Sequence, residues 1–202
     1  MKKFNNFETT IEADYSQAAF FIVAALIGKK PITIKGLNKD SIQGDAKIID
    51  VIKQMGAKFE FDQDLIVRPS QIKGINIDMS NIPDLGPALS VLGAFAIGET
   101  RLLNIERLKI KESNRVTCVI EELSKFKIKI YEENSQLVIR NYKFPHYHGV
   151  VSTHGDHRIA MMLAILMNFA TGQITLDDES VVNKSYPNFW VDYKNLNGEI
   201  YE

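Results

Sequence analysis

The side chains best suited to chemistry in this chain of 202 residues lie in a few short polar segments. The cations Arg115, Arg158 and Lys184 come from three such segments. They could converge on one anion, because guanidinium groups grip carboxylates and phosphates through paired hydrogen bonds. Asp84 and Glu112 add carboxylates that could take and give protons beside that anion. The residue types therefore predict a site that binds an anionic substrate and moves protons on it.

The acidic residues also have a structural interpretation. Asp14, Asp84 and Asp156 each precede an apolar run, where an aspartate can cap the free N–H groups of a helix. The charged segment around Ser113 would then be the exposed first turn of a helix, with that serine as its cap. Arg158 resists this interpretation, because an unpaired charge at the start of a wholly apolar helix is costly to bury.

All four histidines lie close together in the sequence, and this opens the alternative of a metal-binding module. They are His146, His148, His154 and His157. Clustered imidazoles can bind zinc or nickel. No cysteine and no His-Glu-x-x-His pattern accompanies them, so a metal site is the minority interpretation. Cys118, the single cysteine, falls within an amphipathic pattern and is predicted to lie in the core.

The elements that must position these residues come from an internal repeat. Apolar runs at 18–27, 88–97 and 159–167 each have an aspartate before them and a glycine after them, as buried helices do. A short β-rich run follows each one. Two of the copies continue with an amphipathic helix, at 45–56 and 115–126, and then with a hairpin. The repeat predicts an α/β fold built from a β-α-β-α-β-β unit used three times.

The third copy is incomplete. We place the repeats at about residues 8–76, 77–148 and 149–202, and the last one has no final hairpin. A unit without its last strands leaves an open sheet edge. We therefore interpret residues 1–202 as a single domain that is part of a longer protein. Three parallel buried helices would also bring their N-terminal ends to one face, where partial positive charge favours anions.

Composition excludes several classes of protein. Lys and Arg total 24 against 25 Asp and Glu, so the net charge of −1 predicts no nucleic-acid partner and no acidic membrane partner. One cysteine excludes a disulfide framework. The longest apolar runs are shorter than the roughly 20 residues that cross a bilayer. No secretory signal opens the chain, so we expect a cytoplasmic protein.

At its polar segments the sequence resembles the EPSP synthase family, the 3-phosphoshikimate 1-carboxyvinyltransferases. The motifs that carry the resemblance run in family order: Glu12-Ala13-Asp14-Tyr15-Ser16, Gln43-Gly44-Asp45, Ile82-Pro83-Asp84, Leu108-Lys109-Ile110-Lys111-Glu112-Ser113-Asn114-Arg115, Gly155-Asp156-His157-Arg158-Ile159-Ala160-Met161 and Asn183-Lys184-Ser185-Tyr186-Pro187. The fourth and fifth motifs are highly specific when they occur together. The resemblance implies an inverse α/β barrel and the C-terminal half of a two-domain enzyme.

The resemblance also implies a reaction. The enolpyruvyl group of phosphoenolpyruvate would move to the 5-hydroxyl of shikimate 3-phosphate, with release of phosphate and without a cofactor. Asp84 would take the hydroxyl proton, Glu112 would take part in proton transfer at the methylene carbon of phosphoenolpyruvate, and Lys111 would contact the shikimate substrate. The residues that would hold the anionic groups of phosphoenolpyruvate are Arg115, Arg158 and Lys184.

This chain departs from the family pattern at Arg107, four residues before Lys111, where the family often has a substrate-binding asparagine. The substrate contact at this position would fall to an arginine. The N-terminal half of the enzyme, which supplies most of the shikimate phosphate site, would be a required partner. We therefore predict that this chain alone is inactive and binds either substrate weakly.

Two other functions remain as alternatives. The enolpyruvyltransferases that act on UDP-N-acetylglucosamine share the implied fold, but they characteristically carry a cysteine in a mobile loop, whereas Cys118 lies in a helical pattern. The other alternative is a non-catalytic or metal-binding module that uses the histidines between His146 and His157. A scaffold of that kind would need none of the charged residues named above.

Overall fold

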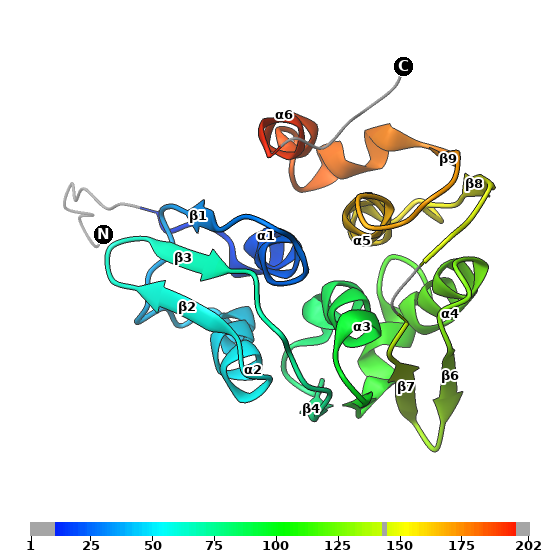
Figure 1. Cartoon of the computed structure of the whole chain (residues 1–202), viewed down its shortest axis with the longest axis horizontal. Helices are drawn as coiled ribbons and strands as arrows, with labels where there is room; N and C mark the ends of the chain where they lie inside the picture. The colour runs from blue at the N-terminus through cyan, green and yellow to red at the C-terminus, as the bar shows by residue number, and fades with distance from the viewer. Residues whose placement is uncertain (1–10, 143–144, 197–202) are drawn as a thin grey trace, which may run out of the picture.

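Three apolar helices lie side by side at the centre of the structure (Figure 1). The computed structural model describes residues 11–142 and 145–196. The central helices are α1 (Tyr15–Ile27), α3 (Gly86–Phe95) and α5 (His157–Met167). Because apolar residues occupy nearly every side of each helix, only contact on all sides removes them from water. Together these helices contribute much of the hydrophobic core.

Three small sheets flank these helices, and each is built from one stretch of the chain. The first, in the order β1-β3-β2, is antiparallel and contains β1 (Ile32–Ile34), β2 (Lys58–Phe61) and β3 (Leu65–Arg68). The second, in the order β4-β5-β7-β6, contains β4 (Asn76–Asp78), β5 (Glu99–Leu103), β6 (Ile130–Glu133) and β7 (Gln136–Arg140). The third pairs β8 (Gly149–Val151) with β9 (Ile174–Leu176) in parallel. The sheets pack against α1, α3 and α5 in turn.

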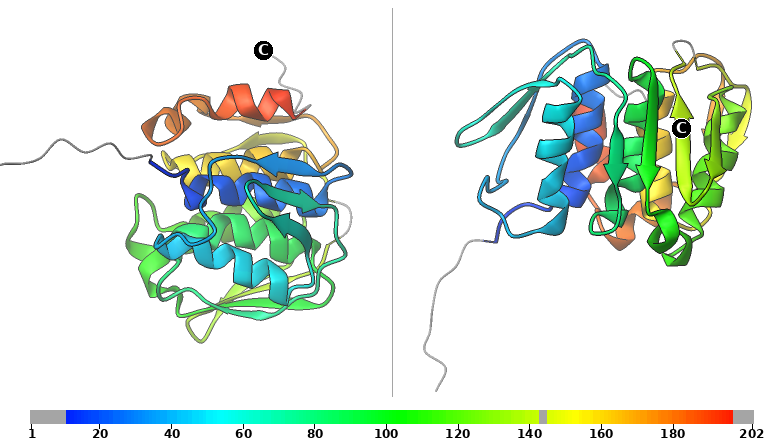
Figure 2. Two further views of the ribbon diagram at one scale, coloured as in Figure 1. Left: turned by 90° about the vertical axis from the view of Figure 1, so that its left-hand side faces the viewer. Right: turned by 90° about the horizontal axis from the view of Figure 1, so that it is seen from below.

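A second set of helices lies outside the central three (Figure 2). These are α2 (Ile48–Gln54), α4 (Arg115–Lys125) and α6 (Phe189–Asn195). The prediction for α4 is confirmed to within a residue. The predicted helix at 45–56 instead begins with a 3₁₀ turn, η1 (Gly44–Lys47), and α2 has no side-chain cap. The Asp45 carboxylate in this turn accepts a hydrogen bond from Ser16.

The starts of the central helices follow the sequence prediction in two cases. Asp14 caps α1 by accepting a hydrogen bond from the Ser16 N–H, and Asp156 caps α5 by accepting one from the Arg158 N–H. Asp84 has no such role. It lies in a 3₁₀ turn, η2 (Pro83–Leu85), and α3 begins without a side-chain cap. The carboxylate of Asp84 is therefore available for other contacts.

The cap of α4 is not the predicted residue. Asn114 accepts the hydrogen bond from the Thr117 N–H, so the expectation that Ser113 caps this helix is wrong. The Ser113 hydroxyl instead donates to Asp156 at 3.0 Å. This contact ties the start of α4 to the start of α5.

The last part of the described chain contains no hairpin. After β9, residues 177–196 form a 3₁₀ turn, η4 (Glu179–Lys184), and then α6. Pro187 precedes α6, whose N-cap is Asn188. Within residues 11–142 and 145–196, no helix is long and apolar enough to cross a membrane.

Candidate active site

The predicted site residues meet where α3, α4 and α5 begin. Asp84 lies in η2 directly before α3, and Arg115 is the first residue of α4. Asp156 caps α5, and Arg158 is the second residue of that helix. Because three helix starts share this region, their free N–H groups add partial positive charge to the side chains that gather there.

Arg115 is the centre of this cluster and is almost fully enclosed. Only 2% of its side chain is exposed. Its Nε donates to Asp156 at 2.8 Å, its Nη2 donates to the other oxygen of Asp156 at 3.2 Å, and its Nη1 donates to Asp84 at 2.8 Å. Burial alone lowers the pKa of an arginine, but the two carboxylates outweigh it and raise the pKa of Arg115. An arginine can be buried without a large loss of stability only when carboxylates pair with it in this way.

Asp84 is the carboxylate on which the cations converge. Besides Arg115, it pairs with Lys111 at 3.0 Å and with Arg158 Nη2 at 3.6 Å. Burial raises the pKa of Asp84, but the three neighbouring cations outweigh burial and hold the pKa below its ordinary value. Asp84 is therefore ionised at neutral pH, which is the state that can accept a proton.

Arg158 makes weaker contacts with its neighbours than Arg115 does. Only 11% of its side chain is exposed, and its ion pair is the longest of the three that Asp84 makes. Its Nη1 is buried and has no hydrogen-bond partner among the described residues. Leaving a charged donor unpaired carries a desolvation cost. An anionic ligand could supply the hydrogen-bond acceptor that this guanidinium lacks.

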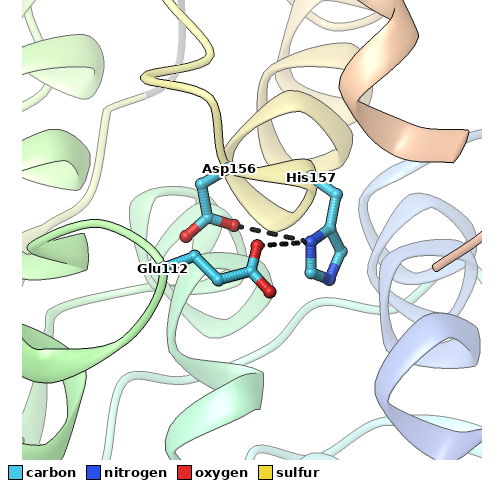
Figure 3. Close-up of side chains that lie close together, drawn as sticks. All are labelled: Glu112, Asp156 and His157. Carbon is cyan, nitrogen blue, oxygen red and sulfur yellow. Dashed lines mark hydrogen bonds and ion pairs between the residues drawn. The ribbon is translucent and has the colours of Figure 1, made fainter. Parts of the chain in front are cut away.

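Glu112, His157 and Lys184 form a second group beside the first. Figure 3 shows Glu112 and His157 next to Asp156. The Glu112 carboxylate lies 2.8 Å from Lys184 Nζ and 2.8 Å from His157 Nδ1. Burial raises the pKa of Glu112, but Lys184 and His157 outweigh it and lower the pKa below its ordinary value. An ionised carboxylate only accepts, so His157 must carry its proton on Nδ1.

The pKa of His157 itself is lowered, chiefly because the ring is buried, although Glu112 acts in the opposite direction. His157 is thus neutral at neutral pH. The two groups together contain four cations, Lys111, Arg115, Arg158 and Lys184, and three carboxylates, Asp84, Glu112 and Asp156. The excess positive charge favours an anionic ligand.

The carboxylates of Glu112 and Asp156 and the ring of His157 are close enough to one another to hold a metal ion. Their charges, however, are already matched by cations. Asp156 accepts two hydrogen bonds from Arg115, and Glu112 pairs with Lys184. A metal ion here would have to displace Lys184 and compete with Arg115. The arrangement therefore suits an anion better than a cation.

The four histidines do not come together. His146 and His148 are exposed, and their rings meet edge to face with centroids 5.7 Å apart. His154 contacts Glu122, and His157 contacts Glu112. Among the described residues, no group of three or more metal-ligating side chains contains two of them. The structure thus separates the histidines on which the alternative of a metal-binding module depended.

Two further residues, Arg107 and Asp45, lie outside this cluster. Arg107 is exposed, and its described hydrogen bond, 2.7 Å long, goes to the Ser80 carbonyl oxygen, not to a member of the cluster. From the first repeat, Asp45 accepts a hydrogen bond from Ser16 at 2.5 Å. Burial, reinforced by the charge of Asp84, raises the pKa of Asp45 despite that hydrogen bond.

Sequence reasoning missed two members of the cluster. Asp156 was given a capping role alone, yet it also binds Arg115. His157 was considered only as a ligand of the alternative metal site, yet it binds Glu112. The apolar run after Arg158 indicated a buried arginine that needs a carboxylate partner, but Asp156 binds Arg115, the first residue of the amphipathic helix α4. Which of the available carboxylates an arginine would find depends on how the repeats pack.

Two solved structures share this fold. EPSP synthase from Acinetobacter baumannii matches 93% of this chain and 46% of its own, with a TM-score of 0.79 and 26% sequence identity. The enolpyruvyl transferase NikO from Streptomyces tendae matches 96% of this chain and 45% of its own, with a TM-score of 0.78 and 20% identity. The fold is thus a mixed α/β fold of the enolpyruvyl transferase class, over about half of those chains.

The sequence comparisons narrow this class to one family. A family model described as EPSP synthase (3-phosphoshikimate 1-carboxyvinyltransferase) matches residues 1–192, and the chain belongs to that family. The 3-phosphoshikimate 1-carboxyvinyltransferase of Clostridium novyi (strain NT) is 44% identical over 193 residues, which are 95% of this chain and 44% of that protein. The one from Clostridium kluyveri is 40% identical over 196 residues, 96% of this chain and 46% of that protein. The chain spans about half the length of the curated relatives it matches.

Proposed function

We propose that this chain forms the C-terminal half-site of an enzyme that transfers the enolpyruvyl group of phosphoenolpyruvate to the 5-hydroxyl of shikimate 3-phosphate. The observation that carries the proposal is the cluster in which four cations face three carboxylates at the start of α3, α4 and α5. Such a cluster suits a site that must hold two anionic substrates and move protons between them. Family membership supports the same reaction.

The fold proposed with this function is an inverse α/β barrel of three β-α-β-α-β-β units within one domain. The order of strands and helices from β4 to β7 matches one complete unit. The first sheet, as described, contains only three strands, and the third contains two. By this proposal, strands from the N-terminal half of the enzyme complete the third unit.

Arg158 and Lys184 are the groups most available to phosphoenolpyruvate. Arg158 has a buried Nη1 without a partner, and Lys184 is 62% exposed. An arriving phosphate or carboxylate would give Arg158 Nη1 its missing partner and would share Lys184 with Glu112, which lies 2.8 Å away. Arg115, by contrast, must reorient or share its Asp84 contact to reach the same anion, because its three hydrogen bonds are already made.

The carboxylates supply the proton transfers that the reaction requires. When the 5-hydroxyl oxygen bonds to C2 of phosphoenolpyruvate, the hydroxyl loses its proton and the methylene carbon gains one. Loss of phosphate then returns the double bond as that carbon gives up a proton. Asp84, ionised beside its three cations, would take the hydroxyl proton. Glu112 would exchange the proton at the methylene carbon, and Lys111, 3.0 Å from Asp84, would contact the shikimate substrate.

The partners of this half-site are the two substrates and the N-terminal half of the enzyme. The proposal needs no metal and no organic cofactor, because the cations already present can stabilise developing charge without reorganising. Both substrates are small soluble metabolites, so we place the reaction in the cytoplasm. Arg107 would take part only if substrate binding drew it from the Ser80 carbonyl.

The test is phosphate release from phosphoenolpyruvate in the presence of shikimate 3-phosphate. The chain is assayed alone and then mixed with the purified N-terminal half of a family enzyme, with both pieces shown to be folded by circular dichroism. We expect no turnover by the chain alone and measurable turnover by the mixture. UDP-N-acetylglucosamine replaces shikimate 3-phosphate in a parallel assay.

The matched controls separate this function from its rivals. The substitution Asp84→Asn keeps the size of the side chain and removes the proton acceptor, so turnover by the mixture should fall at least a hundredfold, within the usual range for a general base. Turnover with UDP-N-acetylglucosamine instead would point to the other enolpyruvyl transfer. A docked but silent mixture would contradict the proposal.

A further inference from the structure

A second charged network lies along α4, away from the helix starts, and it grips the loop that leads into α5. Its centre is Glu122, whose side chain is fully buried. One oxygen of Glu122 accepts a hydrogen bond from the Ser152 N–H at 3.1 Å. The other lies 3.0 Å from His154 Nε2, and Lys125 Nζ contacts both at 2.8 and 2.9 Å. The α4 helix therefore holds residues 152–154 through one carboxylate.

A second carboxylate holds the same loop from the other side. Asp177, which follows β9, accepts a hydrogen bond from the Ser152 hydroxyl at 2.6 Å and one from the Thr153 N–H at 2.8 Å. Burial raises the pKa of Asp177, but these hydrogen bonds outweigh it and lower the pKa. Ser152 thus gives its N–H to Glu122 and its O–H to Asp177, so one residue joins the second repeat to the third.

The gripped segment is followed at once by a tight turn. His154 and Gly155 both have positive φ, at 52° and 67°. The turn closes where the Asp156 N–H donates to the Thr153 carbonyl at 2.9 Å. Asp156, His157 and Arg158 come directly after it. Their places in the cluster are therefore set by a short stretch of backbone whose entry point is held by two carboxylates.

Stability alone is a weak reason for this arrangement. Replacing a buried ion pair by apolar residues of similar volume is often neutral or stabilising, because taking charges out of water is costly. Glu122 is fully buried, and one of its oxygens accepts a hydrogen bond from a backbone N–H of another repeat. Such a contact is better explained if the glutamate fixes the position of that backbone. We propose that Glu122, together with Asp177, is a positioning residue that orients the turn carrying Asp156, His157 and Arg158, so that Arg158 faces the phosphoenolpyruvate anion.

This inference rests on the proposed function, and its test separates the two. The variant Glu122→Gln keeps the size and one acceptor oxygen of the side chain but loses its charge. The matched control is Glu60→Gln, the same change at an exposed residue of β2, away from this network. Each variant is assayed in the mixture with the N-terminal half. We expect E122Q to raise the KM for phosphoenolpyruvate about tenfold. The KM for shikimate 3-phosphate should stay within about twofold, a split that a general loss of folding would not produce.

A second readout needs no activity. Amide hydrogen exchange of the chain alone is followed by mass spectrometry over residues 152–158 and over the β5–β7 sheet. We expect exchange in the turn of E122Q to rise about tenfold, with the sheet unchanged. If E122Q does not fold, Ser152→Ala replaces it. This variant removes the hydroxyl that donates to Asp177 and accepts from the His154 N–H, so it should loosen the same turn to a lesser degree.

The possible results of these experiments test the positioning role of Glu122 and the proposed function separately. Equal exchange in E122Q and E60Q, or unchanged exchange in S152A where E122Q is unfolded, overturns the positioning role. Equal rises in both KM values overturn the assignment to the phosphoenolpyruvate side of the site. A wild-type mixture without turnover would defeat the proposed function, while the exchange experiment would still decide whether Glu122 orders the turn.

Discussion

Arg115 and Arg158 share a residue type and lie in the same cluster, yet their surroundings differ. Arg115 makes three hydrogen bonds to two carboxylates and is sealed from solvent. Arg158 has one long ion pair and a buried nitrogen without a described partner. The first arginine therefore holds the fold of the site together, and the second is free to bind a ligand.

This difference can be measured with two alanine substitutions. Arg115→Ala leaves Asp156 buried without its cation, so the free energy of unfolding should fall by about 3–5 kcal/mol. Arg158→Ala removes a poorly satisfied charge, so the same quantity should change by less than about 1 kcal/mol, while turnover in the mixture falls. Urea unfolding of both variants checks the first part. Equal destabilisation by the two substitutions would contradict the assignment.

His157 provides a pH prediction. Its pKa in the folded chain is lowered from the ordinary value of 6.5, so the unfolded chain binds the proton more readily than the folded one. Stability contributed by neutral His157 is therefore complete above pH 6.5 and is lost as the pH falls below it. We expect the ring to titrate below 6.5 when followed by NMR. Glu112→Gln should lower this midpoint further, because the carboxylate favours the charged ring; a midpoint above 6.5 would overturn the prediction.

At the scale of elements, glycines that follow the three apolar helices are equivalent in the sequence but not in the structure. Gly28 is the C-cap of α1, in an extended conformation, whereas the C-caps of α3 and α5 are Ala96 and Asn168. Gly98 and Gly172 come later and have φ values of 92° and 115°. Their surroundings also differ. A Cβ at Gly98 would meet nothing within 4 Å, but a Cβ at Gly172 would lie 1.9 Å from the Tyr147 carbonyl oxygen.

Alanine at these two glycines should therefore have unequal effects. Gly98→Ala carries only the cost of a left-handed backbone, about 1–2 kcal/mol. Gly172→Ala adds a collision with the backbone of the segment that leads into β8, for a further loss of about 1–3 kcal/mol. Thermal unfolding monitored by circular dichroism gives both values. If Gly172→Ala lowered stability less than Gly98→Ala, the prediction would be wrong, because the segment before β8 would have moved to make room for the added methyl group.

Most of the helices and hairpins were predictable from the periodicity of apolar residues in the sequence. The three apolar helices, the helix α4 and both hairpins are where the sequence places them, because each is specified by residues close together in the chain. The errors are at helix ends. Asn114 caps α4 in place of Ser113, and Asp84 caps no helix. Both exceptions arise because a distant segment makes use of the side chain: Ser113 binds Asp156, and Asp84 binds three cations.

At the scale of the whole molecule, the third sheet has an open edge within the described residues. There, β9 pairs only with β8, and Thr175 in the middle of β9 is exposed. An unpaired strand edge is a template for another strand. By the proposed fold, a hairpin from elsewhere in the enzyme covers this edge.

The chain alone should therefore associate through β9. We expect concentration-dependent association in sedimentation equilibrium, which weakens when Thr175→Lys places a charge in the middle of the edge. The control is Thr117→Lys, the same change on the exposed side of α4. Addition of the N-terminal half should suppress association as the lysine does. Identical association of the wild type and both variants would contradict this prediction.

The sequence by itself determined the repeated pattern of elements, the motifs of the family and the identity of six charged residues gathered at the helix starts. Each of these depends on residue types and on spacing along one stretch of chain. Only the tertiary structure decided that Asp156 and Asp84 share Arg115, that His157 binds Glu112, and that the four histidines separate. These pairs join residues 31 to 45 positions apart. Their choice depends on how the repeats pack against one another, and local periodicity carries no record of that packing.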